Sequence, residues 1–205
     1  MIDLHNEDCL EAMKEMKDNQ FDLAIVDPPY GININNNMGR RKGQKHSGYK
    51  KVDWDNQTPS QKYFDELKRV SVNQIIWGAN YMIDKIQTPS PCWVMWDKRF
   101  SEDVSFAQYE LAWTSFTSSA KKFDKNPNQT NRIHPTQKPV KLYEWLLDNY
   151  AKEGDKILDT HLGSGSIALA CHNRGFDLTA FEIDKEYFDA AKKRLKTHQQ
   201  QLTMF

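Results

Sequence analysis

The sequence predicts an α/β fold built on a doubly wound parallel sheet, and three observations support this expectation. Short apolar runs alternate along the chain with segments of helical periodicity. Two of the apolar runs lead into turns rich in Asp, Gly and Pro, and turns that follow parallel strands are where such sheets bind ligands. The 205 residues suffice for one core, and no change in composition divides them. We therefore expect residues 1–205 to form a single domain.

The expected strands are short apolar segments with β-branched and aromatic residues. Residues 21–26 and 156–158 are the clearest, since each is an apolar run that ends at a polar turn. We expect further strands at residues 74–77, 92–96, 111–115 and 178–182.

The expected helices lie between these strands. Leu10, Met13 and Met16 recur at helical spacing, which predicts a helix over residues 8–16. The same reasoning predicts helices at residues 140–150, 166–173 and 185–196.

Two long polar stretches, residues 31–58 and 117–135, interrupt the alternation. Loops of this length are usually functional or disordered. Although the formal net charge of the chain is zero, residues 38–52 contain six basic residues and no acid. A solvated loop and a nucleic-acid contact both explain such a stretch. The candidates for phosphate contact are Arg40, Arg41, Lys42, Lys45, Lys50 and Lys51.

Composition excludes several other classes of protein. With 39% hydrophobic and 27% charged residues, the chain has a globular composition. No apolar run is long enough to span a membrane and the first residues do not resemble a signal peptide, so we expect a cytoplasmic protein. Cys9, Cys92 and Cys171 are far apart, with no ligand spacing around them, so we expect buried thiols and no metal site.

A glycine-rich turn, Asp159-Thr160-His161-Leu162-Gly163-Ser164-Gly165, follows the expected strand at 156–158. Gly163 and Gly165 let the backbone turn tightly and approach a ligand. Glu182, 17 residues after Gly165, ends the next expected strand, where an acid can accept hydrogen bonds from ribose hydroxyls. The pattern predicts a nucleoside-containing ligand and, taken alone, also suits NAD. A phosphate-binding P-loop is excluded because no Lys follows the glycines.

A second turn, Asp27-Pro28-Pro29-Tyr30, follows the strand at 21–26. Two prolines stiffen the backbone and remove two N–H donors, so the turn offers carbonyls and one carboxylate. Such an acceptor-only site suits an aromatic amine, whose two N–H groups can be held by Asp27 and the Pro28 carbonyl. Tyr30 can stack on the base. The alternative is a common strand-ending turn capped by an aromatic residue.

Taken together, these motifs resemble the DNA amino-methyltransferase family, in the permuted subgroup whose catalytic motif precedes the cofactor motif. Three further segments match that family: residues 134–139, His-Pro-Thr-Gln-Lys-Pro; residues 75–81, Ile-Ile-Trp-Gly-Ala-Asn-Tyr; and residues 6–10, Asn-Glu-Asp-Cys-Leu. The resemblance implies S-adenosylmethionine as cofactor and removes NAD. It also implies a Rossmann-like, mostly parallel seven-stranded sheet with one reversed edge strand, in a single methyltransferase catalytic domain.

The resemblance assigns roles to particular residues. It implies that the catalytic turn comprises Asp27, Pro28, Pro29 and Tyr30. The implied cofactor-binding residues are Asp8, Cys9, Thr136, Lys138, Asp159, Gly163, Gly165, Glu182 and Ile183. The sequence departs from the family at Thr160 and His161, where Pro and an aromatic residue are usual.

The function implied is transfer of a methyl group to the exocyclic 6-amino group of adenine in double-stranded DNA, as in restriction-modification, with the target base flipped out. The leading Asp of the turn favours adenine, because the cytosine-amine enzymes of this family more often have Ser there. Cytosine 4-amino methylation, adenine methylation in RNA and a non-catalytic nucleic-acid-binding module stay as alternatives. We expect both long loops to contact nucleic acid, and a homodimer is left open.

Overall fold

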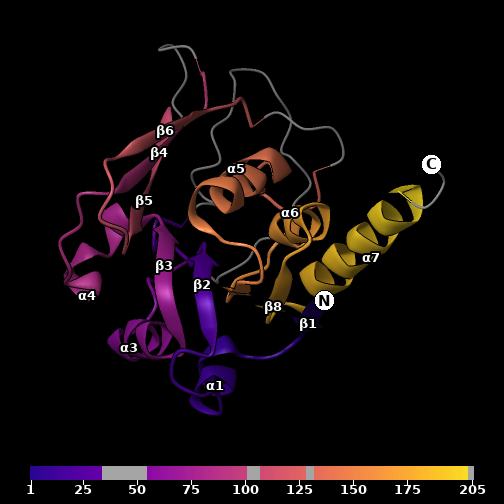
Figure 1. The fold of residues 1–205 in the computed structure, drawn as a ribbon, viewed down its shortest axis with the longest axis horizontal. Coiled ribbons are helices and arrows are strands. Elements are labelled where there is room, and N and C mark those ends of the chain that lie inside the picture. The colour runs from indigo at the N-terminus through magenta and orange to yellow at the C-terminus, as the bar shows by residue number, and fades with distance from the viewer. Residues whose placement is uncertain (34–54, 101–106, 128–131, 203–205) are drawn as a thin grey trace.

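The computed structural model describes residues 1–33, 55–100, 107–127 and 132–202 (Figure 1). Eight strands within these ranges form one sheet. In sheet order they are β1 (Ile2–His5), β8 (Asp177–Phe181), β7 (Lys156–Asp159), β2 (Phe21–Val26), β3 (Ser71–Trp77), β5 (Tyr109–Thr114), β4 (Trp93–Asp97) and β6 (Lys121–Asp124).

The direction of the strands confirms a mostly parallel α/β sheet but corrects its details. Strand β5 runs antiparallel to both β3 and β4, and the other pairs are parallel. The expectation of seven strands with the reversed one at an edge was wrong, because β5 lies third from the edge. The additional strand is β6, which lies inside the stretch 117–135 that was expected to be a loop. Its Lys121, Lys122 and Asp124 are the charged residues that protect an edge strand from further pairing.

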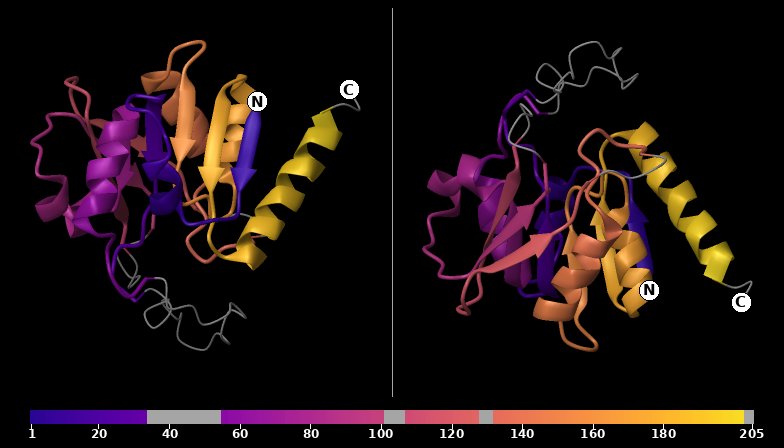
Figure 2. Two further views of the ribbon diagram at one scale, coloured as in Figure 1. Left: turned by 90° about the horizontal axis from the view of Figure 1, so that it is seen from below. Right: turned by 90° about the horizontal axis from the view of Figure 1, so that it is seen from above.

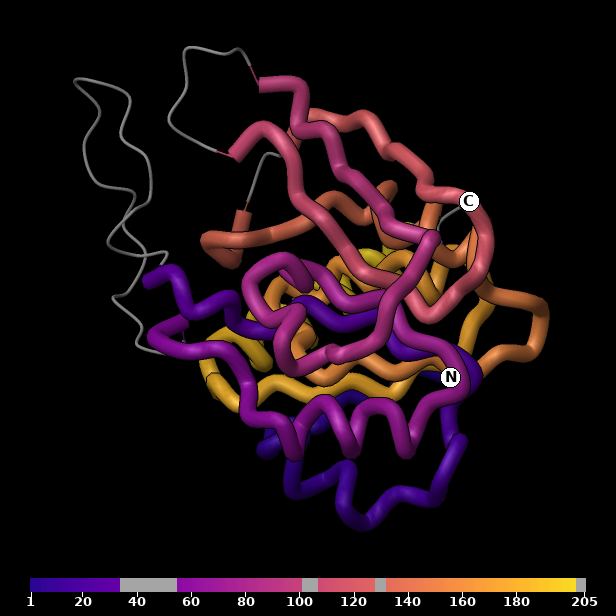
Figure 3. Tube along the Cα trace, turned by 90° about the vertical axis from the view of Figure 1, so that its left-hand side faces the viewer, coloured from indigo at the N-terminus to yellow at the C-terminus, as the bar shows by residue number. Residues whose placement is uncertain are grey.

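Helices cover both faces of the sheet (Figure 2). Along β2, Leu23 and Ile25 pack into one core and Ala24 and Val26 into the other, as the alternation of a strand requires. The first core includes α5 (Val140–Tyr150) and α6 (Ser166–Arg174), with α7 (Lys185–Leu202) beside them. The second includes α1 (Cys9–Lys14) and α3 (Gln61–Val70), which lie side by side although they are far apart in the sequence (Figure 3). The short η1 (Ala79–Tyr81) and α4 (Ile83–Ile86) follow β3.

Most observed boundaries lie within three residues of the expected ones, but helix α7 continues to Leu202 instead of ending at residue 196. Strand β2 and helix α5 begin and end where the sequence predicts. Strand β4 begins at Trp93 rather than at Cys92, whose carbonyl instead accepts a hydrogen bond from the Thr114 hydroxyl at 2.6 Å. Strands β1 and β6, the short η1 and helices α3 and α4 were not predicted.

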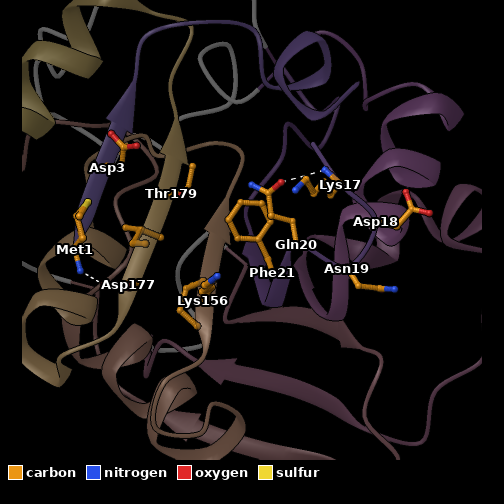
Figure 4. Close-up of a pocket in the computed structure, with 12 residues that line it drawn as sticks. Met1, Asp3, Lys17, Asp18, Asn19, Gln20, Phe21, Lys156, Asp177 and Thr179 are labelled. Carbon is orange, nitrogen blue, oxygen red and sulfur yellow. Dashed lines mark hydrogen bonds and ion pairs between the residues drawn. The ribbon is translucent and has the colours of Figure 1, made fainter. Parts of the chain in front are cut away.

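The two ends of the sheet differ in character. A surface pocket lies at the amino ends of β1, β2, β7 and β8, beside Met1, Phe21, Lys156 and Asp177 (Figure 4). None of the candidate site residues that the structure describes lines it. The described residues of the two candidate turns lie at the opposite, carboxyl ends of the parallel strands, where sheets of this kind bind ligands. In the part of the chain that the structure describes, every helix is too short or too polar to cross a membrane.

Candidate active site

The Asp27–Tyr30 turn begins directly after β2, and the carboxylate of Asp27 is hydrogen-bonded through both oxygens. Its Oδ1 accepts from the Tyr30 hydroxyl at 2.7 Å, and its Oδ2 accepts from Lys138 Nζ at 2.6 Å. The backbone of the turn is fixed from outside, since Asp55 Oδ1 accepts from the N–H of Tyr30 at 2.8 Å and of Gly31 at 3.0 Å. The Asp27 side chain is only 16% exposed. The turn therefore presents a rigid, largely buried anion at the carboxyl end of the sheet.

The Tyr30 ring is held between aromatic and backbone surfaces. It stacks on Tyr81, with ring centroids 5.5 Å apart and planes inclined by 17°. The Tyr30 ring also fills the space where a side chain at Gly78 would begin, and Gly78 has a φ of +65°. Gly78 is thus required both by its left-handed backbone and by the close approach of Tyr30.

We expect Gly78→Ala to lower methyltransferase activity more than its backbone strain alone explains, because the new Cβ overlaps the Tyr30 ring. The matched control is Gly154→Ala, which has a φ of +89° and open space around the added Cβ. Both variants should lose about 1–2 kcal/mol of unfolding free energy from left-handed strain. Urea unfolding and methyl-transfer rates measured on both variants check this. Equal loss of activity in the two would contradict the role of the Tyr30 contact.

Lys138 links the turn to two further charged residues. Its Nζ lies 3.0 Å from Glu110 Oε2, and Glu110 Oε1 lies 2.5 Å from Lys98 Nζ. The Lys138 side chain is 3% exposed, and its ammonium lies 5.3 Å from the ring centroid of Trp77 and 5.6 Å from that of Tyr30. A buried ammonium is stable only when paired, and here two carboxylates and two aromatic faces surround it.

The environment shifts the pKa values of these groups in different directions. Burial raises the pKa of Asp27 above its usual range, and the charge of Lys138 opposes that shift. Burial also acts to raise the pKa of Glu110, but Lys138 and Lys98 outweigh it and lower this pKa to about 2. Glu110 is therefore a permanent anion at neutral pH.

The glycine-rich turn joins β7 to α6 and is braced by Glu182. Gly163 and Gly165 have φ values of +51° and +71°, and a Cβ at Gly165 would lie 3.1 Å from the Cβ of Ala191. Glu182, directly after β8, accepts from the Gly163 N–H through Oε2 at 2.8 Å and from the Asp184 N–H through Oε1 at 2.9 Å. Burial raises the pKa of Glu182 above its ordinary value.

Asp159, the last residue of β7, is a buried carboxyl at the start of this turn. It is 2% exposed, and its Oδ1 accepts from the His161 N–H at 3.0 Å. Burial raises its pKa to about 8. Among the described residues, no cation lies within ion-pair distance of Asp159.

The segment 134–139 packs against the glycine-rich turn. The Lys138 carbonyl accepts from the Ser166 hydroxyl at 2.7 Å. The His134 ring lies 3.6 Å from where a Cβ on Gly163 would stand, and its Nδ1 is 3.1 Å from Thr136 Oγ1. Burial lowers the pKa of His134 to about 4, so the ring is neutral at pH 7. The segment thus brings the Asp27 turn and the glycine-rich turn together through one lysine.

Thr160 and His161, the two positions at which the sequence departs from the family pattern, contact α3. Thr160 Oγ1 lies 2.7 Å from the Tyr63 hydroxyl and 2.9 Å from His161 Nδ1. The His161 ring also meets Tyr63 edge-on, with centroids 5.5 Å apart. Burial lowers the pKa of His161 to about 4. This neutral, hydrogen-bonded pair forms the wall beside Asp159.

The remaining candidate residues have diverse surroundings. Asp8 caps α1 by accepting from the N–H groups of Leu10 and Glu11, and burial raises the pKa of its neighbour Cys9 to about 12. Ile183 is 66% exposed. The six basic candidates, Arg40, Arg41, Lys42, Lys45, Lys50 and Lys51, lie outside the described residues. Within the described residues, no group of three His, Cys, Asp or Glu side chains has the arrangement of a metal site.

Sequence reasoning missed several residues of this site. Glu110 and Lys98 join it from β5 and from the end of β4, and Asp55 reaches it from beyond the stretch 34–54. Of these residues, only Glu110 could have been singled out from the sequence, because it is an acid within the otherwise uncharged strand Tyr109–Thr114. Sequence reasoning also placed Lys138 with the cofactor, whereas its ammonium lies between Asp27 and Glu110.

Comparisons with known proteins agree with the fold. A family model described as DNA methylase matches residues 76–193, more than half of the chain. The Type II methyltransferase M.HpaI of Haemophilus parainfluenzae is 25% identical over 91% of this chain and 72% of its own length. The Type II methyltransferase M2.DpnII of Streptococcus pneumoniae is 25% identical over 96% of this chain and 90% of its own.

Solved structures show the same fold. The complex of M1.HpyAVI with SAM superposes with a TM-score of 0.66 at 21% identity, covering 95% of this chain and 99% of that one. The cytosine-N4-specific PvuII DNA methyltransferase gives a TM-score of 0.65 at 14% identity, covering 97% of this chain and 90% of that one. With its family model, its relatives and its fold in agreement, the chain belongs to the N6/N4 DNA methylase family and is an S-adenosylmethionine-dependent DNA methyltransferase.

Proposed function

We propose that the protein transfers the methyl group to the exocyclic 6-amino group of adenine at a specific DNA sequence. The observation that carries this proposal is the Asp27 carboxylate, held at the carboxyl end of β2 in a turn that offers acceptors. An exocyclic base amine presents two N–H donors, which such a turn complements. Asp rather than Ser at the head of the turn favours adenine over cytosine in the family that this turn resembles.

The residues at the carboxyl ends of β7 and β8 fit the cofactor. S-Adenosylmethionine is cationic at its sulfonium and amino groups and supplies an electrophilic methyl group when bound. Asp159 is a buried carboxyl that has no ion-pair partner among the described residues, so a cationic ligand would relieve its burial. Glu182 would accept hydrogen bonds from the ribose, and the bare backbone of Gly163 and Gly165 would allow close approach.

The turn activates the amine by hydrogen bonding. The target base is turned out of the duplex and packs on the Tyr30 ring, whose orientation Tyr81 and Gly78 fix. Asp27 and the Pro28 carbonyl each accept one amine N–H, which draws the nitrogen lone pair out of the ring. The nitrogen lone pair would then form the bond to the methyl carbon while the sulfur–methyl bond breaks, so that the thioether S-adenosylhomocysteine leaves, and the excess proton passes from the nitrogen to solvent afterwards. Asp27 stays ionised and stabilises the positive charge on the nitrogen.

Methylation in a host tests the choice of base. The protein is expressed in bacteria that lack adenine and cytosine methylation, and single-molecule sequencing of genomic DNA reads the modified base and its sequence context. We expect N6-methyladenine within one short sequence. N4-methylcytosine instead would overturn the adenine assignment and keep the amine mechanism, because both bases present the same amine.

We expect Glu182→Ala to weaken S-adenosylmethionine binding about 10- to 100-fold, through loss of charge-assisted hydrogen bonds worth about 1.5–3 kcal/mol. The variant also removes the acceptor that braces the Gly163 N–H. Calorimetry on folded protein measures the dissociation constant. The control is Glu153→Ala, because Glu153 is an exposed acid between α5 and β7. A dissociation constant equal to that of the wild type would show that Glu182 does not hold the cofactor.

Cofactor affinity should rise as the pH rises from 6 to 7.5. Because the pKa of Asp159 is about 8, this carboxyl is mostly protonated in the free protein over that range. A bound cation favours the carboxylate, so binding releases a proton, and the affinity gains at most about tenfold per pH unit until the pH reaches the pKa of the free protein. Asp159→Asn should abolish this dependence. An equal slope in both proteins would mean that Asp159 does not face the cofactor.

A further inference from the structure

Four charged side chains from four different segments form a continuous chain beside the Asp27 turn. Asp27 follows β2, Lys138 precedes α5, Glu110 lies on β5 and Lys98 follows β4. The successive nitrogen–oxygen distances are 2.6 Å, 3.0 Å and 2.5 Å. The reversed strand β5 is what brings Glu110 next to the turn, since it lies directly beside β3 in the sheet. Neither Glu110 nor Lys98 belongs to a motif that the proposed function uses.

We propose that Glu110 is a positioning residue for methyl transfer, which shares Lys138 with Asp27 and takes over its ammonium when the target amine binds Asp27. This inference rests on the proposed role of Asp27. It makes Lys138 a mobile counter-ion of the catalytic carboxylate.

The hydrogen bonds of Asp27 show why a second acceptor for Lys138 is useful. Oδ1 already accepts from Tyr30 and Oδ2 from Lys138, so an arriving amine competes with the ammonium for the carboxylate. Glu110 Oε2 is buried and lies 3.0 Å from the same Nζ in an ion pair that lacks hydrogen-bond alignment, and no other described residue donates to it. A small movement of Nζ toward Glu110 therefore gives this oxygen a donor and releases an acceptor at Asp27.

The charges favour the same exchange. Asp27, Lys138 and Glu110 together carry one net negative charge, and positive charge grows on the amine nitrogen during transfer. Without Glu110, the ammonium of Lys138 would stay on Asp27 and these two charges would cancel. The nearby Lys98 would then make the net charge of the region positive. Charges in such a site act through a low effective dielectric, so removal of one anion acts directly on the transition state.

Protonation of Asp27 should lower kcat at low pH, and this fall is the acidic limb of the profile of kcat against pH. Two variants should shift this limb in opposite directions. The groups that face Asp27 are Lys138, Glu110 and Tyr30, with Asp159 and Tyr143 acting at longer range. Glu110→Gln removes a negative charge, so the pKa of Asp27 falls and the limb moves to lower pH. Lys98→Met removes a positive charge and leaves Glu110 free to draw Lys138 away, so the limb moves to higher pH.

The experiment measures kcat against pH for the wild type and both variants, on whichever base the wild type methylates. For Glu110→Gln we expect kcat to fall about 10- to 100-fold, as misplacement of a catalytic group does, with the dissociation constant of S-adenosylmethionine unchanged. Glu110→Asp, which keeps the charge, should restore the position of the limb. The matched control is Glu153→Gln, which makes the same change at an exposed acid.

Limbs that stay at the wild-type pH in both variants would overturn the proposal, whatever happens to kcat or to the melting temperature. If Glu110→Gln does not fold, the direction of the Lys98→Met shift decides in its place. Absence of methyl transfer by the wild type would refute the proposed function itself. Transfer by the wild type with unshifted limbs would refute only the role of Glu110.

Discussion

Replacing Asp27 with Asn lowers the rate of methyl transfer about 100-fold or more, with little change in cofactor affinity. Asn keeps the shape of the side chain but exchanges one acceptor for an NH2 donor, which faces the N–H groups of the target amine. It also removes the anion that stabilises positive charge on the nitrogen. Single-turnover transfer of labelled methyl to duplex DNA measures the chemical step directly.

The fold of this variant is expected to survive, because Lys138 retains Glu110 as an anionic partner at 3.0 Å. Asp22→Asn is the matched control. Asp22 lies near the amino end of β2, the strand that Asp27 follows, and accepts from the Lys156 N–H at 2.8 Å. Near-normal transfer by Asp27→Asn would contradict the mechanism. A lowered melting temperature with normal activity of the folded fraction would reduce Asp27 to a turn residue.

Replacing Lys138 with Met destabilises the protein by about 3–5 kcal/mol, because a buried charge network that loses one partner leaves its counter-ions uncompensated. Here Asp27 loses its ion-pair partner among the described residues, and Glu110 keeps only Lys98. Urea unfolding followed by circular dichroism measures the change. The matched control is Lys14→Met, since Lys14 is 48% exposed, its ion-pair partner Glu11 is 68% exposed, and loss of such a surface pair costs at most about 1 kcal/mol.

The double variant Lys138→Met with Glu110→Gln tests the cause of that loss. Once the ammonium is gone, Glu110 repels Asp27, so removing the charge of Glu110 should recover part of the stability and the two changes should couple by about 1 kcal/mol or more. If the double variant is less stable than Lys138→Met by the full cost of Glu110→Gln alone, the two residues do not interact. The loss would then come from packing of the lysine stem against Trp77 and Tyr30.

The sequence alone was sufficient for the elements that depend on local pattern. Strand β2 is a short apolar run, and its Leu23 and Ile25 alternate with Ala24 and Val26 across two cores. Helix α5 carries a clear apolar face, and its observed bounds equal the predicted ones. The two turns were recognisable because glycine and proline leave a local chemical signature. Helix α3 also had a signal that was overlooked, since its buried Tyr63, Phe64, Leu67 and Val70 recur at helical spacing.

The rest depends on contacts between distant segments, which no local pattern encodes. The order of strands places β5 between β3 and β4, and that order brings Glu110 to Lys138. Strand β6 contains one apolar residue, Phe123, and three charged ones, so its pairing with β4 could not be read from periodicity. Lys98 and Asp55 are polar residues in connecting segments, and only the folded chain places their charges near Asp27 and Tyr30.

Amine activation at Asp27 is tested most directly by locating the transferred methyl group. Purified protein is incubated with duplex DNA and S-adenosylmethionine that carries a deuterated methyl group. The DNA is then digested, and its nucleosides are separated by chromatography and identified by mass spectrometry. We expect deuterated N6-methyl-2′-deoxyadenosine with the wild type and only background with Asp27→Asn. Label on a ring carbon, or equal labelling by the two proteins, would contradict amine activation at Asp27.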